Sequence, residues 1–141
     1  MMNKGHDIAM ALRAAYLSMH RQTNAHLAAV GITADQFVCL ALLAEEDGIT
    51  QQELVRRANS DPNTIRAMLM ILEKRGLVRR EKHPTDGRAR HVTLTFRGRT
   101  VYRRSLKEVK EVQDLLEAQI PSGAEKTVMK YFESILTHLS A

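Results

Sequence analysis

The stretch DPNTIRAMLMILEKRGLVRREKHPTDGRARHVTLT, residues 61–95, decides how the rest of this chain is interpreted. Asp61 is a residue type that caps helices, and Pro62 fits the first helical position because it has no N–H to leave unpaired. Gly76 is placed to end that helix. Two short alternating runs then flank a turn that contains Pro and Asp-Gly, and this pattern predicts a β-hairpin.

The sequence on either side of this stretch has the periodicity of helices, with Gly, Pro or Asp-Gly between the segments. The pattern predicts helices over residues 6–30, 34–46, 50–58, 62–75, 96–119 and 122–139. The third and fourth helices are joined by a short polar turn at Asn59-Ser60, which makes them a helix-turn-helix candidate. A hairpin and a further helix follow. We therefore predict a mainly α protein with a small β-hairpin wing, a winged helix-turn-helix.

Three of these helices begin at a threonine that is suited to capping. Thr33 and Thr95 are placed to cap the second and the fifth helix. Thr50 opens the third helix with Glu53 three residues later, which predicts a reciprocal capping box: each side chain bonds the other residue's backbone N–H.

Positive charge is concentrated in the middle of the 141-residue chain, whose formal net charge is +5. Residues 50–104 contain 14 Lys and Arg against five Asp and Glu, so this segment carries +9 and the remainder carries −4. A basic centre favours a surface that faces phosphate groups. A solvated surface without a partner is the alternative that charge alone leaves open.

The helix predicted over residues 62–75 has two unlike faces. An apolar stripe at Ile65, Leu69 and Leu72 predicts the buried face. The opposite face, at 100° per residue, consists of Asn63, Ala67, Met70 and Lys74, flanked by Thr64 and Arg66. Short polar groups and arginine near the start of a helix are the groups that reach base edges and phosphates in the major groove. An ordinary surface helix is the alternative, because Asn and Thr are common in any first turn.

Arginines also mark the hairpin. Arg88 and Arg90 follow its turn, and arginine on a narrow loop fits a minor groove, where the potential is most negative over A·T-rich sequence. Asp86 is placed to pair with a nearby arginine and brace the tip. Arginines at the base of the hairpin and on the third helix suit phosphates better than bases: Arg79, Arg80, Arg56 and Arg57.

These residues together resemble the core of the MarR family of winged-helix transcriptional regulators. The matching pieces are the Asn63-Thr64 helix start, LEKRGLV over residues 72–78, Asp86-Gly87-Arg88, and Leu94-Thr95 followed by Gly98-Arg99. QQELVRRA from Gln51 corresponds to the family's helix before the turn. Helix order and total length match as well, so the resemblance covers essentially the whole chain.

The resemblance implies a ligand-responsive repressor that binds a pseudo-palindromic operator in double-stranded DNA as an obligate homodimer. It implies a DNA-binding lobe over residues 33–99 and N- and C-terminal dimerisation helices over residues 1–30 and 100–141. The apolar stripes on these terminal helices need partners, which lie either in a second subunit or within the same chain.

Carried over by position, the resemblance places Asn63, Thr64 and Arg66 in the major groove and Arg88 in the minor groove, with Asp86 as a brace. Three positions depart from the family's pattern: Ala67, where a polar or basic residue is frequent, and Met70 and Ile71, where charged residues are frequent. The recognition helix is therefore less polar than usual. Met70 has two interpretations, contact with a thymine methyl group and packing against a neighbouring element, and the sequence leaves both open.

Members of this family usually respond to small ligands, often aromatic acids or phenols, in a pocket between the dimer helices and the DNA-binding lobes. The residues that we expect to line a pocket for a small aromatic effector are Tyr16, Met19, His20 and Phe37. A place in the core or in the dimer interface is the alternative for each of them.

Other functional classes find little support in the residues. Cys39 lies within FVCLALLA, which predicts a buried, unreactive thiol. The six histidines are not spaced with Cys or carboxylates as metal ligands, so no metal is expected. We find no Gly-rich phosphate loop, nucleophile elbow or His-Glu metal motif, and we therefore expect neither an enzyme nor a cofactor.

The location of the protein is predicted from its apolar segments. The longest apolar run, residues 37–44, is too short to cross a bilayer, and the N-terminus does not have the layout of a signal peptide. We expect a cytoplasmic protein that does not enter a membrane. Two other functions stay open: a non-specific architectural DNA-binding protein, and a winged-helix module that binds other proteins.

Overall fold

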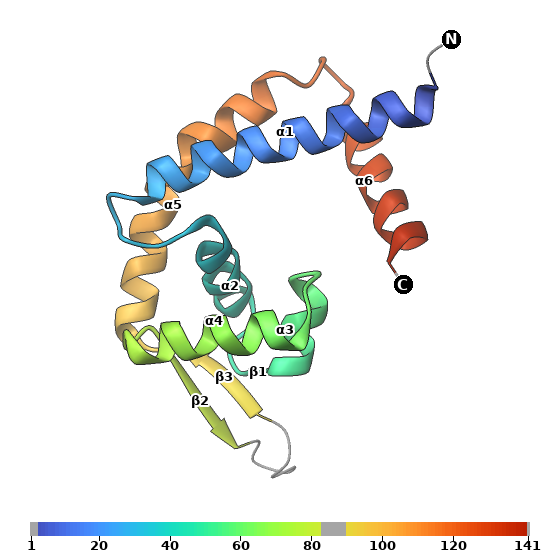
Figure 1. Cartoon of the computed structure of the whole chain (residues 1–141). Helices are drawn as coiled ribbons and strands as arrows, with labels where there is room; N and C mark the ends of the chain where they lie inside the picture. Colours follow the sequence, from blue (N-terminus) through green and yellow to red (C-terminus); the bar gives the residue numbers. More distant parts are fainter. Residues whose placement is uncertain (1–2, 83–89, 141) are drawn as a thin grey trace. The chain divides into compact units, whose positions relative to one another are not determined.

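The computed structural model describes residues 3–82 and 90–140 (Figure 1). Its elements in chain order are α1 (Lys4–Leu27), α2 (Ala34–Glu45), β1 (Ile49–Thr50), α3 (Gln51–Arg57), α4 (Pro62–Lys74), β2 (Val78–Lys82), β3 (Arg90–Leu94), α5 (Phe96–Ala118) and α6 (Glu125–Leu139). All six predicted helices are present, and the mainly α winged helix-turn-helix is confirmed. The largest differences from the predicted ranges are at two ends: α1 stops three residues early, at Leu27, in a turn, and α6 begins three residues late.

The sheet has three strands, not the two of the predicted hairpin. Its order is β1-β3-β2, and both pairings are antiparallel. Val78 pairs with Leu94 and Lys82 with Arg90 along the hairpin, as alternation predicts. The strand that the sequence did not reveal is β1, in which Ile49 pairs with Val92. Two residues are too few to produce a periodic pattern, so β1 is defined only by its partner strand.

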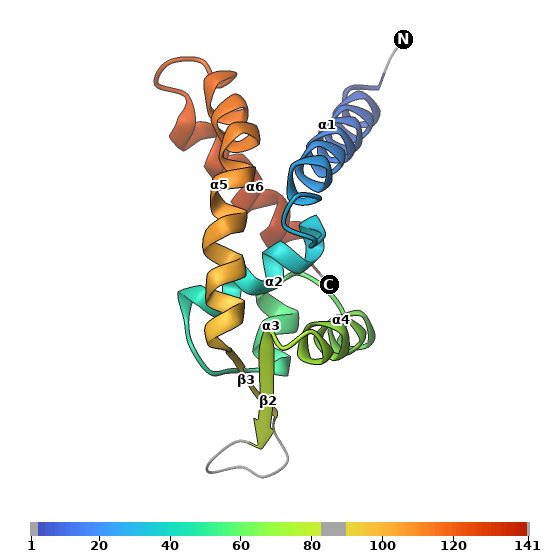
Figure 2. The ribbon, with the colours of Figure 1, turned by 90° about the vertical axis from the view of Figure 1, so that its left-hand side faces the viewer.

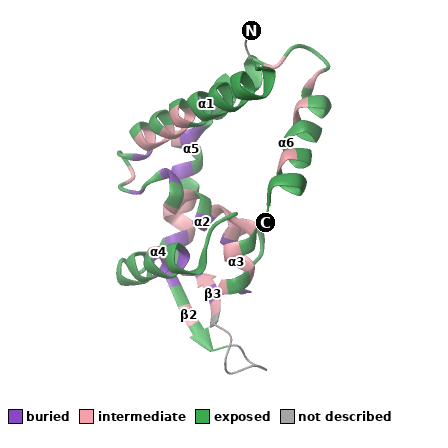
Figure 3. Ribbon diagram, turned by 45° about the vertical axis from the view of Figure 1, so that its right-hand side comes forward, coloured by how far each residue is buried: buried purple, intermediate pink, exposed green. Residues whose placement is uncertain are grey.

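A continuous apolar core joins α2, α3, α4 and the sheet (Figure 3). The predicted stripe of α4 is confirmed, because Ile65, Leu69 and Leu72 are all buried. Leu54 of α3 and Val92 of β3 are fully buried beside it. Burying side chains of this size supplies about 1.5–3 kcal/mol each. The core therefore fixes which face of α4 stays in contact with solvent.

Local residue chemistry explains where α2 and α5 begin. Thr33 and Gln36 form a reciprocal capping box at the start of α2, with both bonds at 3.1 Å. The hydroxyl of Thr95 accepts a bond from the N–H of Gly98 at 3.0 Å and donates one to the carbonyl of Gly76 at 2.6 Å. Thr95 thus caps α5 and ties its start to the end of α4. A Cβ on Gly98 would lie 2.0 Å from the carbonyl oxygen of Leu77, so only glycine fits this junction.

The predicted capping box at the start of α3 is only half correct. Thr50 accepts a bond from the N–H of Glu53 at 3.1 Å, as expected. The Glu53 carboxylate does not return to Thr50; it bonds the guanidinium groups of Arg56 and Arg57. Charge-assisted bonds are about twice as strong as neutral ones, so two arginines one turn away outcompete a backbone N–H.

The chain divides into two compact units, Met1–Val109 and Lys110–Ala141. The first unit contains the core, with α4 packed beside β2 of the hairpin (Figure 2). In the second unit α6, which the structure describes in full, has no buried residue. Among the described residues, no helix combines the length and apolar character needed to cross a membrane.

Candidate DNA-binding surface

The turn between α3 and α4 brings the start of α4 to the surface. Asn59 adopts a left-handed conformation with φ of 51°, which Asn tolerates better than most residues. The N–H of Ser60 bonds the carbonyl of Val55 at 3.0 Å, and this bond closes the turn. Pro62 then occupies the first turn of α4, as predicted. The two helices are thereby joined as the helix-turn-helix that the sequence predicted.

Asp61 organises the first turn of α4. Its carboxylate accepts a bond from the N–H of Thr64 at 2.9 Å and another from the Thr64 hydroxyl at 2.7 Å. The hydroxyl bond and the backbone bond from Thr64 together lower the pKa of Asp61, so its carboxylate stays ionised where helix N–H groups favour negative charge. Thr64 is therefore engaged with the cap in the free protein.

The exposed face of α4 carries the polar groups that were predicted to meet bases. Asn63, Arg66 and Lys74 are all exposed. One nitrogen of the Arg66 guanidinium donates to Oδ1 of Asn63 at 2.8 Å, which holds the two side chains next to each other. These two residues project from the first half of α4, where a helix end is best placed to reach base edges.

Apolar side chains continue this face beyond Arg66. Ala67 is exposed, and Met70 and Ile71 keep 57% and 50% of their surface in contact with solvent. Met70 therefore does not pack into the core, and its contact with a thymine methyl group stays a prediction.

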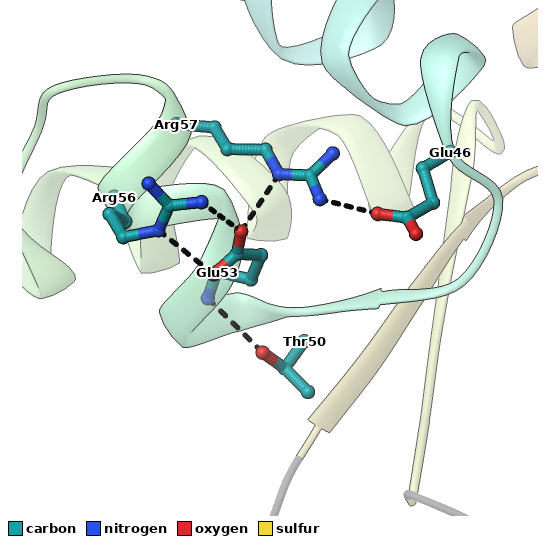
Figure 4. A network of polar contacts seen from close by, with 5 residues as sticks. All are labelled: Glu46, Thr50, Glu53, Arg56 and Arg57. Carbon is teal, nitrogen blue, oxygen red and sulfur yellow. Dashed lines mark hydrogen bonds and ion pairs between the residues drawn. The ribbon is translucent and has the colours of Figure 1, made fainter.

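The α3 arginines already have carboxylate partners (Figure 4). Arg57 Nε lies 2.9 Å from Glu53, its Nη2 bonds Glu46, and its side chain is 28% exposed. Arg56 Nε bonds Glu53 at 3.0 Å, but 71% of its side chain stays exposed. Bonds from Arg56 and Arg57 lower the pKa of Glu53 to about 2. The structure thus places Arg57 as a brace between α2 and α3, and leaves Arg56 accessible to a phosphate.

The base of the hairpin separates its two arginines. Arg79 is exposed and lies 3.8 Å from Glu81, whereas Arg80 turns toward α4 and pairs with Glu73. The pairing of Arg80 was missed, since it depends on the hairpin lying against α4, which no local pattern shows. Asp86 and Arg88 lie outside the described residues. Arg90 begins β3, and its side chain is not described.

A pocket of about 360 Å³ lies within the first unit. It is lined by Tyr16, Asp35, Val38, Cys39, Ala58, Asn59, Ser60, Thr64, Ile65 and Met68. Of the four residues predicted for an effector pocket, Tyr16 is in this lining. His20 stacks on the Tyr16 ring at 5.5 Å between centroids, and Phe37 stacks on Tyr102 at 5.8 Å. Met19 is partly buried on α1.

The lining residues from α4 and its preceding turn were missed by sequence reasoning. Thr64 was assigned to DNA contact and Ile65 to the core, and nothing in their spacing marks a cavity behind α4. The pocket therefore adjoins the helix whose outer face carries Asn63 and Arg66.

The predicted thiol environment is confirmed. Cys39 is buried, and burial raises its pKa to about 12. Within residues 3–82 and 90–140, no three side chains of His, Cys, Asp or Glu lie close enough together to hold a metal ion.

Known proteins share this fold and parts of this sequence. The model of the MarR family matches residues 32–89. The HTH-type transcriptional repressor Rv2887 of Mycobacterium tuberculosis is 29% identical over 114 residues, which are 81% of this chain and 82% of that protein.

Two solved structures superpose closely on the chain. A MarR mutant from Escherichia coli complexed with operator DNA has a TM-score of 0.84 at 23% identity, covering 96% of this chain and 99% of that one. CouR from Rhodococcus jostii RHA1 bound to p-coumaroyl-CoA has a TM-score of 0.85 at 24% identity, covering 96% and 95%. At these identities the two structures show that the fold is shared.

Proposed function

This chain belongs to the MarR family of transcriptional regulators, and we propose that it is a ligand-responsive repressor that binds a pseudo-palindromic operator as a homodimer. The observation that carries the proposal is the exposed face of α4. Asn63 and Arg66 sit there on a helix whose other face is locked into the core by Ile65 and Leu69. A rigid helix with polar groups at its start is suited to the major groove.

The hairpin extends this surface. Arg79 stands exposed on β2, and Arg56 lies exposed at the end of α3, so both can meet phosphates on either side of α4. Arg88 and Arg90 would enter the adjoining minor groove, with Asp86 holding the tip. Phosphate contacts of this kind set affinity and its salt dependence, whereas α4 sets base preference.

Exposed apolar side chains support the homodimer. Along α1, Ile8, Leu12 and Tyr16 are exposed, and on α6 so are Phe132, Leu136 and Leu139. A monomer rarely leaves helices with this much apolar surface uncovered. A second copy of the chain is the occupant that the family implies, and its twofold axis would match a palindromic DNA site.

The pocket behind α4 supports control by a small ligand. Tyr16 and Met68 supply an aromatic and a soft apolar wall, and Asn59 and Thr64 supply polar groups, which suits an aromatic acid or phenol. The complex of CouR with p-coumaroyl-CoA is an aromatic-ligand complex of the same fold. A ligand that fits the pocket in only one position of α4 would shift the population toward that conformation. If that conformation does not fit the operator, the ligand weakens operator binding.

The test is selection of bound duplexes from a random library, followed by fluorescence anisotropy on the enriched sequence and a scrambled duplex at physiological salt. We expect an inverted repeat with half-site centres about 10 base pairs apart, and an affinity gap of about a thousandfold or more. Enrichment of no sequence, with equal binding to all duplexes, would identify an architectural DNA-binding protein instead. Absence of binding even at low salt would identify a module for protein partners.

A further inference from the structure

The exposed face of α4 has an apolar centre. Ala67 and Met70 lie between Asn63 at the start of the helix and Lys74 at its end. Steps of four, three and four residues place these four side chains within one narrow stripe of a helix that turns 100° per residue. The stripe points away from the buried side of α4, and Met70 is 57% exposed.

The charges around this stripe favour nucleic acid as its occupant. Arg66 stands beside the stripe and Lys74 ends it, and the carboxylate of neighbouring Glu73 is paired with Arg80. An apolar centre with cations at its edges matches a groove in which phosphates flank methyl-bearing bases.

We propose that Ala67 and Met70 recognise the C5-methyl groups of thymine in the major groove. The thymine methyl is the one apolar group that base edges display there, and small apolar side chains contact it in known complexes. Met70 reaches further than Ala67, and its flexible thioether adapts to a methyl whose position varies with base step. This inference rests on the proposed function and assigns to it a base class: half-sites with thymine opposite the middle of α4.

Ile71 supplies a matched control on the same helix. Its exposed fraction, 50%, is close to that of Met70, and it is the next residue in the chain. A step of one residue turns it 100° from Met70, toward the edge of the stripe. Ile71 is also the residue one turn after Ala67, so it borders the stripe without belonging to it. Truncating Ile71 therefore removes a similar exposed apolar side chain at the edge of the stripe and leaves Met70 in place.

The experiment exchanges thymine for uracil, one position at a time, in the duplex enriched from the random library. Uracil lacks only the 5-methyl group, so hydrogen-bonding edges are unchanged. We expect at least one thymine per half-site at which the exchange weakens binding by about fourfold, the factor that corresponds to one methyl-sized group. Met70→Ala should bind the thymine and uracil duplexes equally at that position, and Ile71→Ala should keep the wild-type ratio.

Several outcomes would overturn the inference while the proposed function survives. One is specific binding that no uracil exchange weakens, and another is a thymine preference that persists in Met70→Ala. Loss of that preference in Ile71→Ala would move the contact away from Met70. A change in oligomeric state of Met70→Ala by light scattering would make a second copy the occupant. A library that yields no enriched duplex would instead overturn the proposed function itself.

Discussion

Nη2 of Arg80 on β2 lies 2.9 Å from Oε1 of Glu73 on α4, and this ion pair joins the hairpin to the helix beside it. The Arg80 side chain is mostly covered, so the pair is screened less than one in open solvent. The ion pair holds the hairpin and α4 at a fixed spacing. A fixed spacing is what simultaneous contact with two successive grooves of a duplex would require.

We predict that Glu73→Gln weakens this link. The free energy of unfolding should fall by about 0.5–1 kcal/mol, as for other half-exposed pairs. The affinity gap between the enriched and scrambled duplexes should narrow, because a loosened hairpin weakens the specific complex, whereas the removed negative charge strengthens binding to both duplexes alike. Urea denaturation and anisotropy measure the two effects.

Glu81→Gln is the control for this change. This substitution also removes one carboxylate beside an arginine. The carboxylate of Glu81 lies 3.8 Å from the guanidinium of Arg79, and both side chains are exposed. We expect almost no loss of stability and the same rise in non-specific binding. Equal narrowing of the affinity gap in both variants would show that charge, and not the link to α4, sets discrimination.

A second prediction concerns Arg66. Arg66→Ala should cost about 1–3 kcal/mol on the enriched duplex and relax base preference at the contacted position. The loss of affinity for the scrambled duplex should be smaller, because the bond from Arg66 to Asn63 positions the guanidinium for contact with a base. Fluorescence anisotropy on the enriched and scrambled duplexes separates the loss of base recognition from a general loss of affinity for DNA.

Arg13→Ala, on the exposed surface of α1, provides the matched loss of one positive charge. It should leave the affinity gap unchanged. If Arg66→Ala and Arg13→Ala weaken all sequences to the same degree, Arg66 does not read bases.

The α4 and hairpin regions were predictable because single residues dictate their local geometry. Asp61 caps α4 through two bonds from Thr64. Gly76 follows the end of α4 in a left-handed conformation with φ of 75°. A residue type with a strong conformational preference acts before any tertiary contact forms, so its effect can be read from sequence. The exposure of Asn63 and Arg66 follows directly, since the buried stripe fixes their side of the helix.

The parts that could not be predicted depend on pairs far apart in the chain. β1 exists only because Ile49 meets Val92, and the orientation of Arg80 depends on Glu73 lying beside β2. The carboxylate of Glu53 had two kinds of local partner, the backbone N–H of Thr50 and the guanidinium groups of two arginines. The capping-box motif predicts the first and takes no account of the stronger, charge-assisted bonds to the second. The roles of the residues at the tip of the hairpin stay predictions.

A third prediction tests the homodimer. Phe132 lies on the exposed apolar stripe of α6. Phe132→Glu would place a charge where a second copy is proposed to pack, and burying an unpaired charge is costly. Light scattering should give a mass near 15.9 kDa for this variant and about twice that for the wild type. Affinity for the two-half-site duplex should fall steeply.

Lys130→Glu alters charge on the opposite face of α6 and should remain dimeric, with affinity close to that of the wild type. A Phe132→Glu variant that stays at the dimer mass would exclude this stripe as the interface.

The fourth prediction follows from the Glu53 network, in which bonds from Arg56 and Arg57 lower the pKa of Glu53 from 4.5 to about 2. A carboxylate with a lowered pKa in the folded state stabilises the fold fully above its unfolded pKa. That contribution is lost as pH falls through the folded pKa, here between about pH 4.5 and pH 2.

Glu53→Gln should therefore be less stable than the wild type at pH 7, and the difference in the free energy of unfolding should shrink across this window. Urea midpoints at equal protein concentration measure it, with Glu133→Gln on α6 as the control for losing one exposed carboxylate. A constant difference from pH 7 to pH 2 would mean that the Gln variant is destabilised through packing, and that the ion pairs of Glu53 with Arg56 and Arg57 add nothing to stability.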